Sequence, residues 1–148
     1  MSIKVDVQIA SKNSGIPDRK KIRMWAETCL ESIRENAEFT IRIVDESEIT
    51  DLNSRWRGIN KATNVLSFPA GENVALPELL GDIVICAPVV IREAEGQDKS
   101  LDAHWAHMVI HGILHLLNYD HINDKEAQIM ESIEIEKLAK LDYPNPYN

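Results

Sequence analysis

Three histidines stand close together in the last third of the chain, in the stretch HGILHLLNYDH (111–121). His111 and His115 are four residues apart, so on a helix their imidazoles project from one face about one turn apart. Two such rings can converge on one divalent ion, which needs ligand atoms about 2 Å from its centre. Asn118 tolerates the left-handed conformation that ends helices, so the chain can turn back and bring His121 to the same ion. The pattern predicts a three-histidine metal site, with one zinc ion per chain.

The intervals between these histidines match the H-x-x-x-H-x-x-x-x-x-H arrangement of metzincin-type zinc proteases. Two histidines four residues apart on a helix are often only surface residues. A third histidine at the metzincin spacing argues against a chance arrangement. In metzincins a Glu follows the first His and acts as the general base. Here that position is Gly112, which has no side chain to accept a proton. The sequence therefore favours a metal site that serves a reaction other than peptide hydrolysis.

Further polar residues fall near the three histidines. On a helical wheel of residues 101–117, His104 and His107 lie within about 40° of His111, and apolar residues fill the opposite side. We expect this histidine stripe to face a cleft or solvent. For His104 and His107 two interpretations stay open: each side chain is simply exposed or packed, or it contacts a metal ligand or the substrate. Asp120 either orients a ligand imidazole or takes a proton from water on the metal, or it caps the next helix or faces solvent.

Apolar periodicity predicts the elements that must position these residues. Alternation at every second residue predicts strands at 3–9 and 39–45, a short strand is expected at 65–69, and the apolar run at 79–88 predicts a fourth strand that Pro88 closes. Helical spacing and capping residues predict helices at 18–36, 45–57, 89–97, 100–117 and 123–141. In the second of these helices, Ile49, Leu52 and Trp56 are expected on the inner face. The mixture predicts an α+β fold in a single domain, 1–148, with one four-stranded mixed sheet packed against about five helices.

Composition narrows the class of protein. Hydrophobic residues make up 44% of the 148 residues, which is enough for a core, and no apolar run is long enough to span a membrane. The N-terminus lacks the apolar region of a secretory signal, so we expect a cytoplasmic protein. Cys29 and Cys86 each lie in an apolar segment, and we expect buried, reduced thiols. The net charge of −8 argues against a general nucleic-acid coat, because phosphate contacts need Lys and Arg, but it leaves room for a local basic site.

Three segments resemble the signature of one family. HMVIHGILHLLNYDH (107–121) resembles the H-x-x-x-H-G-x-L-H-L-x-G-Y-D-H motif of the YbeY family of bacterial rRNA maturation factors. LNSRWRGINKATNVLSFP (52–69) and LGDIVI (80–85) resemble two further motifs of that family. Their order and spacing fit over nearly the whole chain.

This resemblance implies a single-strand-specific, metal-dependent endoribonuclease that matures the 3′ end of 16S rRNA and acts in ribosome quality control. Its partners would be single-stranded RNA, 16S rRNA and the small ribosomal subunit, with no DNA substrate. The motif places the zinc ligands at His111, His115 and His121 and the family's functional arginine at Arg57, so we expect Arg57 and His111 to be catalytic.

The residue types are consistent with this chemistry. The guanidinium of Arg57 can clamp a phosphate with two parallel hydrogen bonds, although it can also be a plain surface charge. Arg55 and Lys61 would add local positive potential for substrate binding. Asp82 either supports a metal ligand or satisfies backbone amides at the start of a strand.

There are two departures from the family motifs. Asn118 replaces a Gly, and Asn tolerates the same backbone region, so the turn is expected to survive. Asn64 replaces an Asp, which removes one carboxylate. Two other functions stay open: a metal-dependent hydrolase of another class, such as a peptidase, and a non-catalytic ribosome-binding factor with a structural zinc.

Overall fold

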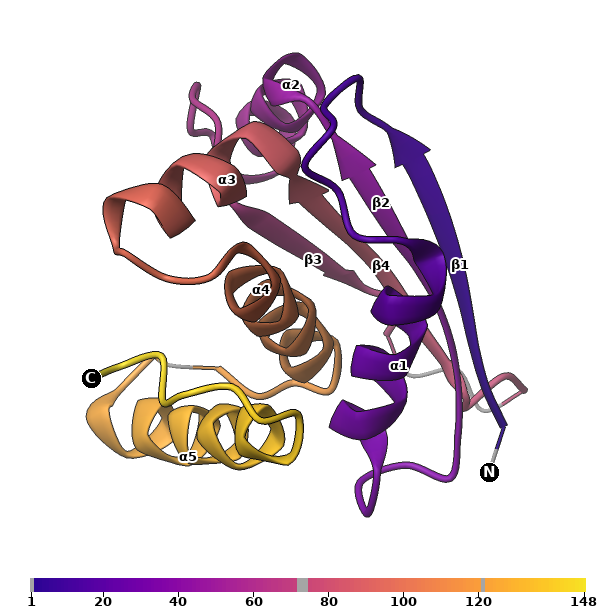
Figure 1. The fold of residues 1–148 in the computed structure, drawn as a ribbon. Helices are drawn as coiled ribbons and strands as arrows, with labels where there is room; N and C mark the ends of the chain where they lie inside the picture. Colours follow the sequence, from indigo (N-terminus) through magenta and orange to yellow (C-terminus); the bar gives the residue numbers. More distant parts are fainter. Residues whose placement is uncertain (1, 72–74, 121) are drawn as a thin grey trace.

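The computed structural model describes residues 2–71, 75–120 and 122–148, and its four strands form one mixed sheet (Figure 1). The strands are β1 (Ser2–Ala10), β2 (Asn36–Val44), β3 (Val65–Pro69) and β4 (Leu79–Cys86). Their order is β1-β2-β4-β3, in which β1, β2 and β4 run parallel and β3 runs antiparallel to β4. The predicted four-stranded mixed sheet is therefore confirmed, and β3 forms one of its edges.

Five helices are present in the described residues, as the sequence predicted. They are α1 (Arg19–Leu30), α2 (Glu46–Arg57), α3 (Ala87–Gly96), α4 (Leu101–Leu116) and α5 (Asp124–Lys140). The first helix is shorter than predicted, because Glu31 leaves the helical conformation and Ser32 is left-handed, which frees the chain to enter β2. Within the described parts of the chain, no helix combines the length and apolarity that a membrane crossing needs.

The helices are distributed unequally over the two faces of the sheet (Figure 1). The larger core fills the face that α4 covers, and it draws its buried side chains from α1, α3, α4, α5 and the strands, with Cys29 among them. On the opposite face α2 covers one end of the sheet through a smaller cluster of Val44, Ile49, Leu66, Val84 and Cys86. Both cysteines are buried and unpaired, which confirms that prediction. Beyond α2 the same face carries polar strand residues that are exposed or half-buried, such as Gln8, Thr40 and Asp82.

Helix α4 is buried on nearly all sides, so the histidine stripe faces a cleft over only part of its length. His104 and His107 are only 3% and 7% exposed. The helix lies between the sheet and α5, and α1 and α3 also pack against it. His111 and His115, one and two turns further on, are half-buried and reach a hollow. The stripe is thus divided: α3 and α5 cover His104 and His107, whereas His111 and His115 reach the hollow.

The turn after α4 has the expected conformation. Asn118 is left-handed, with a φ of 71°. The Tyr119 amide then donates to the Leu114 carbonyl at 3.0 Å, which closes the helix as in a Schellman motif. Asn118 therefore adopts the left-handed conformation at the position where the YbeY-type motif has Gly. His121, the third expected ligand, lies outside the described residues.

Trp56 does not lie on the inner face of α2, contrary to the sequence prediction. Its side chain is 69% exposed, whereas Ile49 is fully buried. The last turn of α2 extends past the smaller cluster, and the indole contacts Phe68 of β3 edge to face, with ring centroids 5.9 Å apart.

Gly112 allows α4 to approach the sheet closely. A Cβ atom at this position would lie 2.8 Å from the Cγ2 methyl of Ile83, and the Ser67 hydroxyl donates to the Gly112 carbonyl at 2.9 Å. That methyl is branched next to the backbone, so it cannot swing away as the end of a long side chain would. A glutamate at this position has no room, which gives a physical reason for the absence of the protease base.

We expect Gly112→Ala to lower the free energy of unfolding by about 1–3 kcal/mol, because the new methyl group overpacks the contact with Ile83. Urea denaturation followed by circular dichroism measures this change. Gly96→Ala is the matched control: it also lies in a helix, has no atom within 4 Å of the added Cβ, and should leave stability unchanged or slightly higher. Equal stability of the two variants would contradict the close packing of α4 on β4.

Candidate metal and substrate site

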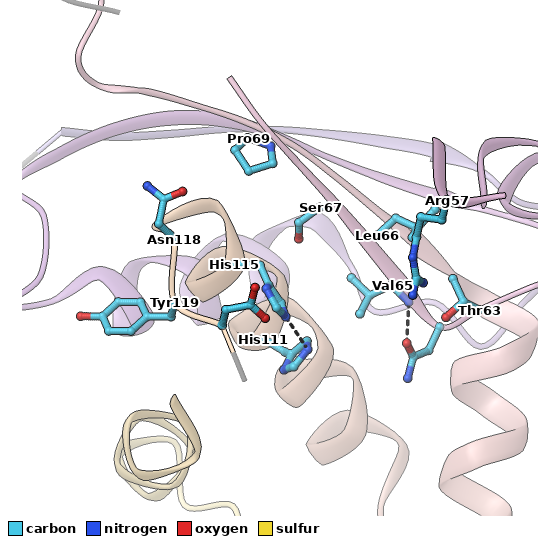
Figure 2. Close-up of a pocket in the computed structure, with 12 residues that line it drawn as sticks. Arg57, Thr63, Val65, Leu66, Ser67, Pro69, His111, His115, Asn118 and Tyr119 are labelled. Atoms are coloured by element: carbon cyan, nitrogen blue, oxygen red, sulfur yellow. Dashed lines mark hydrogen bonds between the residues drawn. The ribbon is translucent and has the colours of Figure 1, made fainter. Parts of the chain in front are cut away.

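A hollow of about 650 Å³ lies where the C-terminal half of α4 meets β3 and the end of α2 (Figure 2). Its polar lining includes His111 and His115 from α4, Arg57 from α2, Ser67 from β3 and Asp120 from the turn after α4. Figure 2 shows the two imidazoles side by side, with Arg57 reaching in from another element. The fold thus brings four of the expected site residues, Asp120 among them, into one hollow.

The two imidazoles are arranged as a pair of metal ligands would be. The Nε2 atoms of His111 and His115 lie 3.1 Å apart. Two nitrogens bound to one tetrahedral zinc ion at 2.0–2.1 Å are roughly 3.3–3.4 Å apart. Both rings therefore direct these nitrogens to nearly the distance that a shared ion requires.

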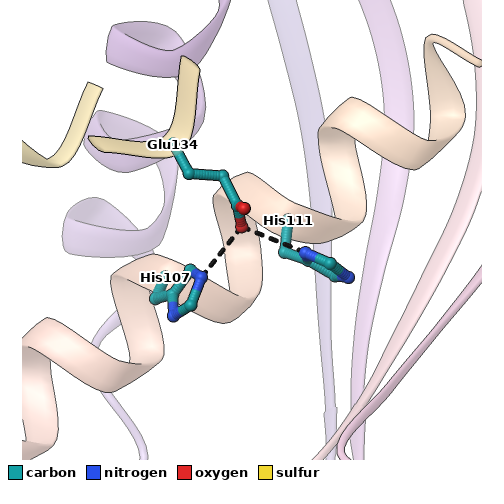
Figure 3. A group of neighbouring side chains, drawn as sticks. All are labelled: His107, His111 and Glu134. Atoms are coloured by element: carbon teal, nitrogen blue, oxygen red, sulfur yellow. Dashed lines mark hydrogen bonds and ion pairs between the residues drawn. The ribbon is translucent and has the colours of Figure 1, made fainter. Parts of the chain in front are cut away.

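A buried carboxylate on α5 holds His111 from behind (Figure 3). One oxygen of Glu134, Oε2, accepts hydrogen bonds from His111 Nδ1 at 3.0 Å and from His107 Nε2 at 2.8 Å. The hydroxyl of Tyr147, near the C-terminus, donates to Oε1 at 2.6 Å. Burial by itself would raise the pKa of Glu134, but the hydrogen bonds from the two histidines outweigh it and lower the pKa to about 2.

The charge on Glu134 decides which nitrogen of His111 carries the proton. An ionised carboxylate only accepts hydrogen bonds, so the Nδ1 atom of His111 must bear the hydrogen. The Nε2 atom of the neutral ring is then left with a lone pair directed at the hollow. Metal-binding histidines commonly donate their second nitrogen to a carboxylate in this way. The donor set of this hollow is therefore suited to a divalent ion.

The sequence reasoning missed Glu134. It lies on the buried face of α5, between Met130 and Leu138 at intervals of four residues, and only 1% of it is exposed. A carboxylate in the middle of an apolar helical stripe was the available signal, because such a group is seldom buried without a partner.

His107, His111 and Glu134 also form a cluster that could hold a metal ion, since their donor atoms lie within 4.8 Å of one another. However, the oxygens of Glu134 already accept three hydrogen bonds from the protein. A metal ion bound by these three residues would have to replace the hydrogens that His107 and His111 donate to Glu134. The chemistry of the cluster thus fits a support for His111 better than a separate set of ligands.

Arg57 is positioned by a buried amide. The side-chain carbonyl of Asn53, which is 1% exposed, accepts from Arg57 Nη1 at 3.4 Å. The amide nitrogen of Asn53 donates to the Lys61 carbonyl at 2.9 Å and so ties down the loop after α2. Gly58 ends α2 in the left-handed conformation, directly after Arg57. The guanidinium is therefore placed at the hollow while it remains exposed to a ligand.

Three other expected residues are not brought to the histidines. Arg55 is ion-paired with Asp51 at 3.0 Å on the outer side of α2, and the side chain of Lys61 does not line the hollow. Asp82 does not support a metal ligand: its neighbour Ile83 faces α4, so Asp82 projects from the opposite face of the sheet. Of the two roles that the sequence left open for Asp82, this geometry disfavours support of a metal ligand.

Asn64 belongs to a second hydrogen-bonded chain behind the hollow. Its amide donates to both oxygens of Glu93 at 3.2 and 3.3 Å, and Glu93 accepts from His104 Nε2 at 3.0 Å. Burial lowers the pKa of His104, although Glu93 opposes this shift. A carboxylate at position 64 would face the carboxylate of Glu93 and repel it, whereas the Asn64 amide donates hydrogen bonds to it.

We expect His115→Ala to abolish metal binding, whereas His107→Gln should retain one ion per chain, because an amide can still donate to Glu134. Elemental analysis of the purified variants measures this. Loss of the ion in His107→Gln, with binding intact in His115→Ala, would instead place the metal at the His107–His111–Glu134 cluster.

We also expect Glu134→Gln to weaken metal affinity about 10- to 100-fold, because the proton on His111 Nδ1 loses its charged acceptor. Competition against a chromogenic chelator gives the dissociation constant. Glu136→Gln is the matched control, since this exposed residue lies on the same helix and is paired with Lys140 at 3.9 Å, away from the histidines. Unchanged affinity in Glu134→Gln would rule out its role in orienting His111.

Comparison with known proteins agrees with the motifs. The family model described as Endoribonuclease YbeY matches residues 6–142. Proteins named Endoribonuclease YbeY from Pseudomonas syringae pv. syringae (strain B728a) and Pseudomonas savastanoi pv. phaseolicola (strain 1448A / Race 6) are each 55% identical to this chain over 148 residues, which cover 98% of this chain and 88% of theirs. The solution structure of TM1509 from Thermotoga maritima superimposes with a TM-score of 0.63 at 27% identity, over 91% of this chain and 88% of that one. The chain belongs to the YbeY endoribonuclease family.

Proposed function

We propose that this protein is a single-strand-specific, zinc-dependent endoribonuclease of the cytoplasm that matures the 3′ end of 16S rRNA and takes part in ribosome quality control. The observation that carries the proposal is the convergence of Arg57 with His111 and His115 on one hollow, from two separate helices. The names of the 55% identical relatives supply the reaction class. The rRNA and the small ribosomal subunit enter as the partners that the family resemblance implies.

The proposed ligands are His111, His115 and His121. A zinc ion held by three neutral imidazoles would act as a Lewis acid toward a phosphate oxygen and lower the pKa of a bound water. Glu134 keeps the proton of His111 on Nδ1, so that Nε2 is available to the ion. Tyr147 donates to the same carboxylate and thereby ties the C-terminal segment to the site.

Arg57 would bind the phosphate to be cleaved. Its planar guanidinium can donate two parallel hydrogen bonds to phosphate oxygens and offset the charge that develops during cleavage. Asp120 lines the same hollow and is the proposed proton acceptor, since a carboxylate there can take a proton from the attacking water. The recessed position of the two imidazoles between α4 and β3 favours a single strand, which bends into a hollow more readily than a duplex.

The peptidase alternative has little support from the packing. The general base of a metzincin would stand at position 112, where Ile83 already fills the space for a side chain. A purely structural metal is also less favoured, because the pair of imidazoles opens onto a hollow that Arg57 shares.

We expect Arg57→Ala to slow cleavage of a labelled single-stranded RNA about 10²- to 10³-fold, because a donor to the developing charge is lost. The variant should fold normally, since Arg57 is exposed. Arg55→Ala is the matched control: it removes the same charge two residues away, outside the hollow, and should keep the wild-type rate. In cells that carry only Arg57→Ala, mapping of 16S rRNA should show unprocessed 3′ ends. Full cleavage by Arg57→Ala would refute the proposed mechanism, and mature 3′ ends in those cells would refute the proposed role in rRNA maturation.

A further inference from the structure

A second hollow, of about 790 Å³, lies on the other side of β3 from the histidines. It lies next to α2, on the face of the sheet opposite to the one that α4 packs against. Arg57, Leu66, Ser67 and Pro69 line both hollows. The edge strand β3 is thus a ridge between them, and Arg57 stands at the place where they meet.

An aromatic pair lines this second hollow. Trp56 is 69% exposed, whereas Trp25 and Trp105 are completely buried. Phe68 packs against the smaller core cluster and meets the indole edge to face, at an interplanar angle of 65°. The indole is therefore held by a contact that leaves most of its surface open.

The polar groups of the hollow suit a nucleobase better than a phosphate. Asp82 pairs with Phe68 across the β3–β4 ladder, and in the described part of the chain its carboxylate makes no hydrogen bond or ion pair. Such a group repels phosphate and accepts hydrogen bonds from the N–H groups of a base. Arg42 is already bound by Glu48 through bonds of 2.6 and 3.0 Å, which leaves Arg57 as the cation that both hollows share.

We propose that Trp56, supported by Phe68, is a stacking platform for the base of the nucleotide next to the phosphate at Arg57, and that Asp82 accepts a hydrogen bond from the edge of that base. The inference rests on the proposed function. In a single strand the bases and the phosphates project to different sides of the sugar. A strand that crosses β3 can therefore place its phosphate in the histidine hollow and a base in the second hollow. Stacking on aromatic side chains is a common way for proteins to hold unpaired bases.

The test combines a variant with modified substrates. A series of short single-stranded RNAs carries one abasic nucleotide at successive positions on each side of the cleaved bond. For wild type, the KM should rise about 5- to 150-fold at one position adjacent to that bond, and Trp56→Leu should show the same loss with intact RNA. The two losses should not add, because both remove the same stack. Trp56→Phe should recover most of the affinity, and Met24→Ala, an exposed apolar residue on α1 outside both hollows, should behave as wild type.

Two results would overturn the subsite. One is a wild-type enzyme that tolerates an abasic nucleotide at every position. The other is a Trp56→Leu variant that stays as sensitive to each abasic position as wild type, which would mean that the indole meets something other than a base. Absence of any RNA cleavage by wild type would instead refute the proposed function. In that case quenching of tryptophan fluorescence by the same RNAs decides the subsite, since Trp56 is the exposed indole: quenching that disappears in Trp56→Leu supports it, and no quenching refutes it.

Discussion

The arrangement of the site depends on one buried charge, the carboxylate of Glu134. Removing such a group from water is costly unless hydrogen bonds replace its hydration. Two imidazoles of α4 and the hydroxyl of Tyr147 supply these bonds, so α5 and the C-terminal segment are fixed against the helix that carries the site. The hydrogen bond from His111 to Glu134 places a hydrogen on Nδ1 of that ring. One interaction therefore stabilises the packing of the helices and prepares a nitrogen lone pair for a ligand.

The edge strand β3 relates this centre to the rest of the surface. Ser67 faces α4 and donates to the carbonyl of Gly112, while Leu66 and Phe68 face the smaller cluster under α2. Because alternate residues of a strand project to opposite faces, five residues separate two hollows of different chemistry. One presents imidazoles and the other presents aromatic rings and a carboxylate. Arg57, held by the buried Asn53, is common to both.

The acidic character of the chain is consistent with recognition through a few chosen contacts. A net charge of −8 does not favour binding along many phosphates. Two basic side chains near the site already form ion pairs: Arg55 is paired with Asp51, and Arg42 with Glu48. Affinity for a nucleic acid would then depend on Arg57, on the metal site and on stacking rather than on overall attraction.

The sequence by itself determined the four strands, the five helices, the pairing of His111 with His115 and the turn at Asn118, because these follow from local periodicity and local backbone preference. The motifs also indicated the family, and they drew attention to Arg57, which lines the hollow. Only the tertiary structure decided that His104 and His107 are buried, that Glu134 supports His111, that Asp82 faces away and that Trp56 is exposed. Periodicity shows which side of an element is apolar, but not which distant element covers its polar side. For α4, enclosed by the sheet and three helices, that choice is made by contacts between residues far apart in the chain.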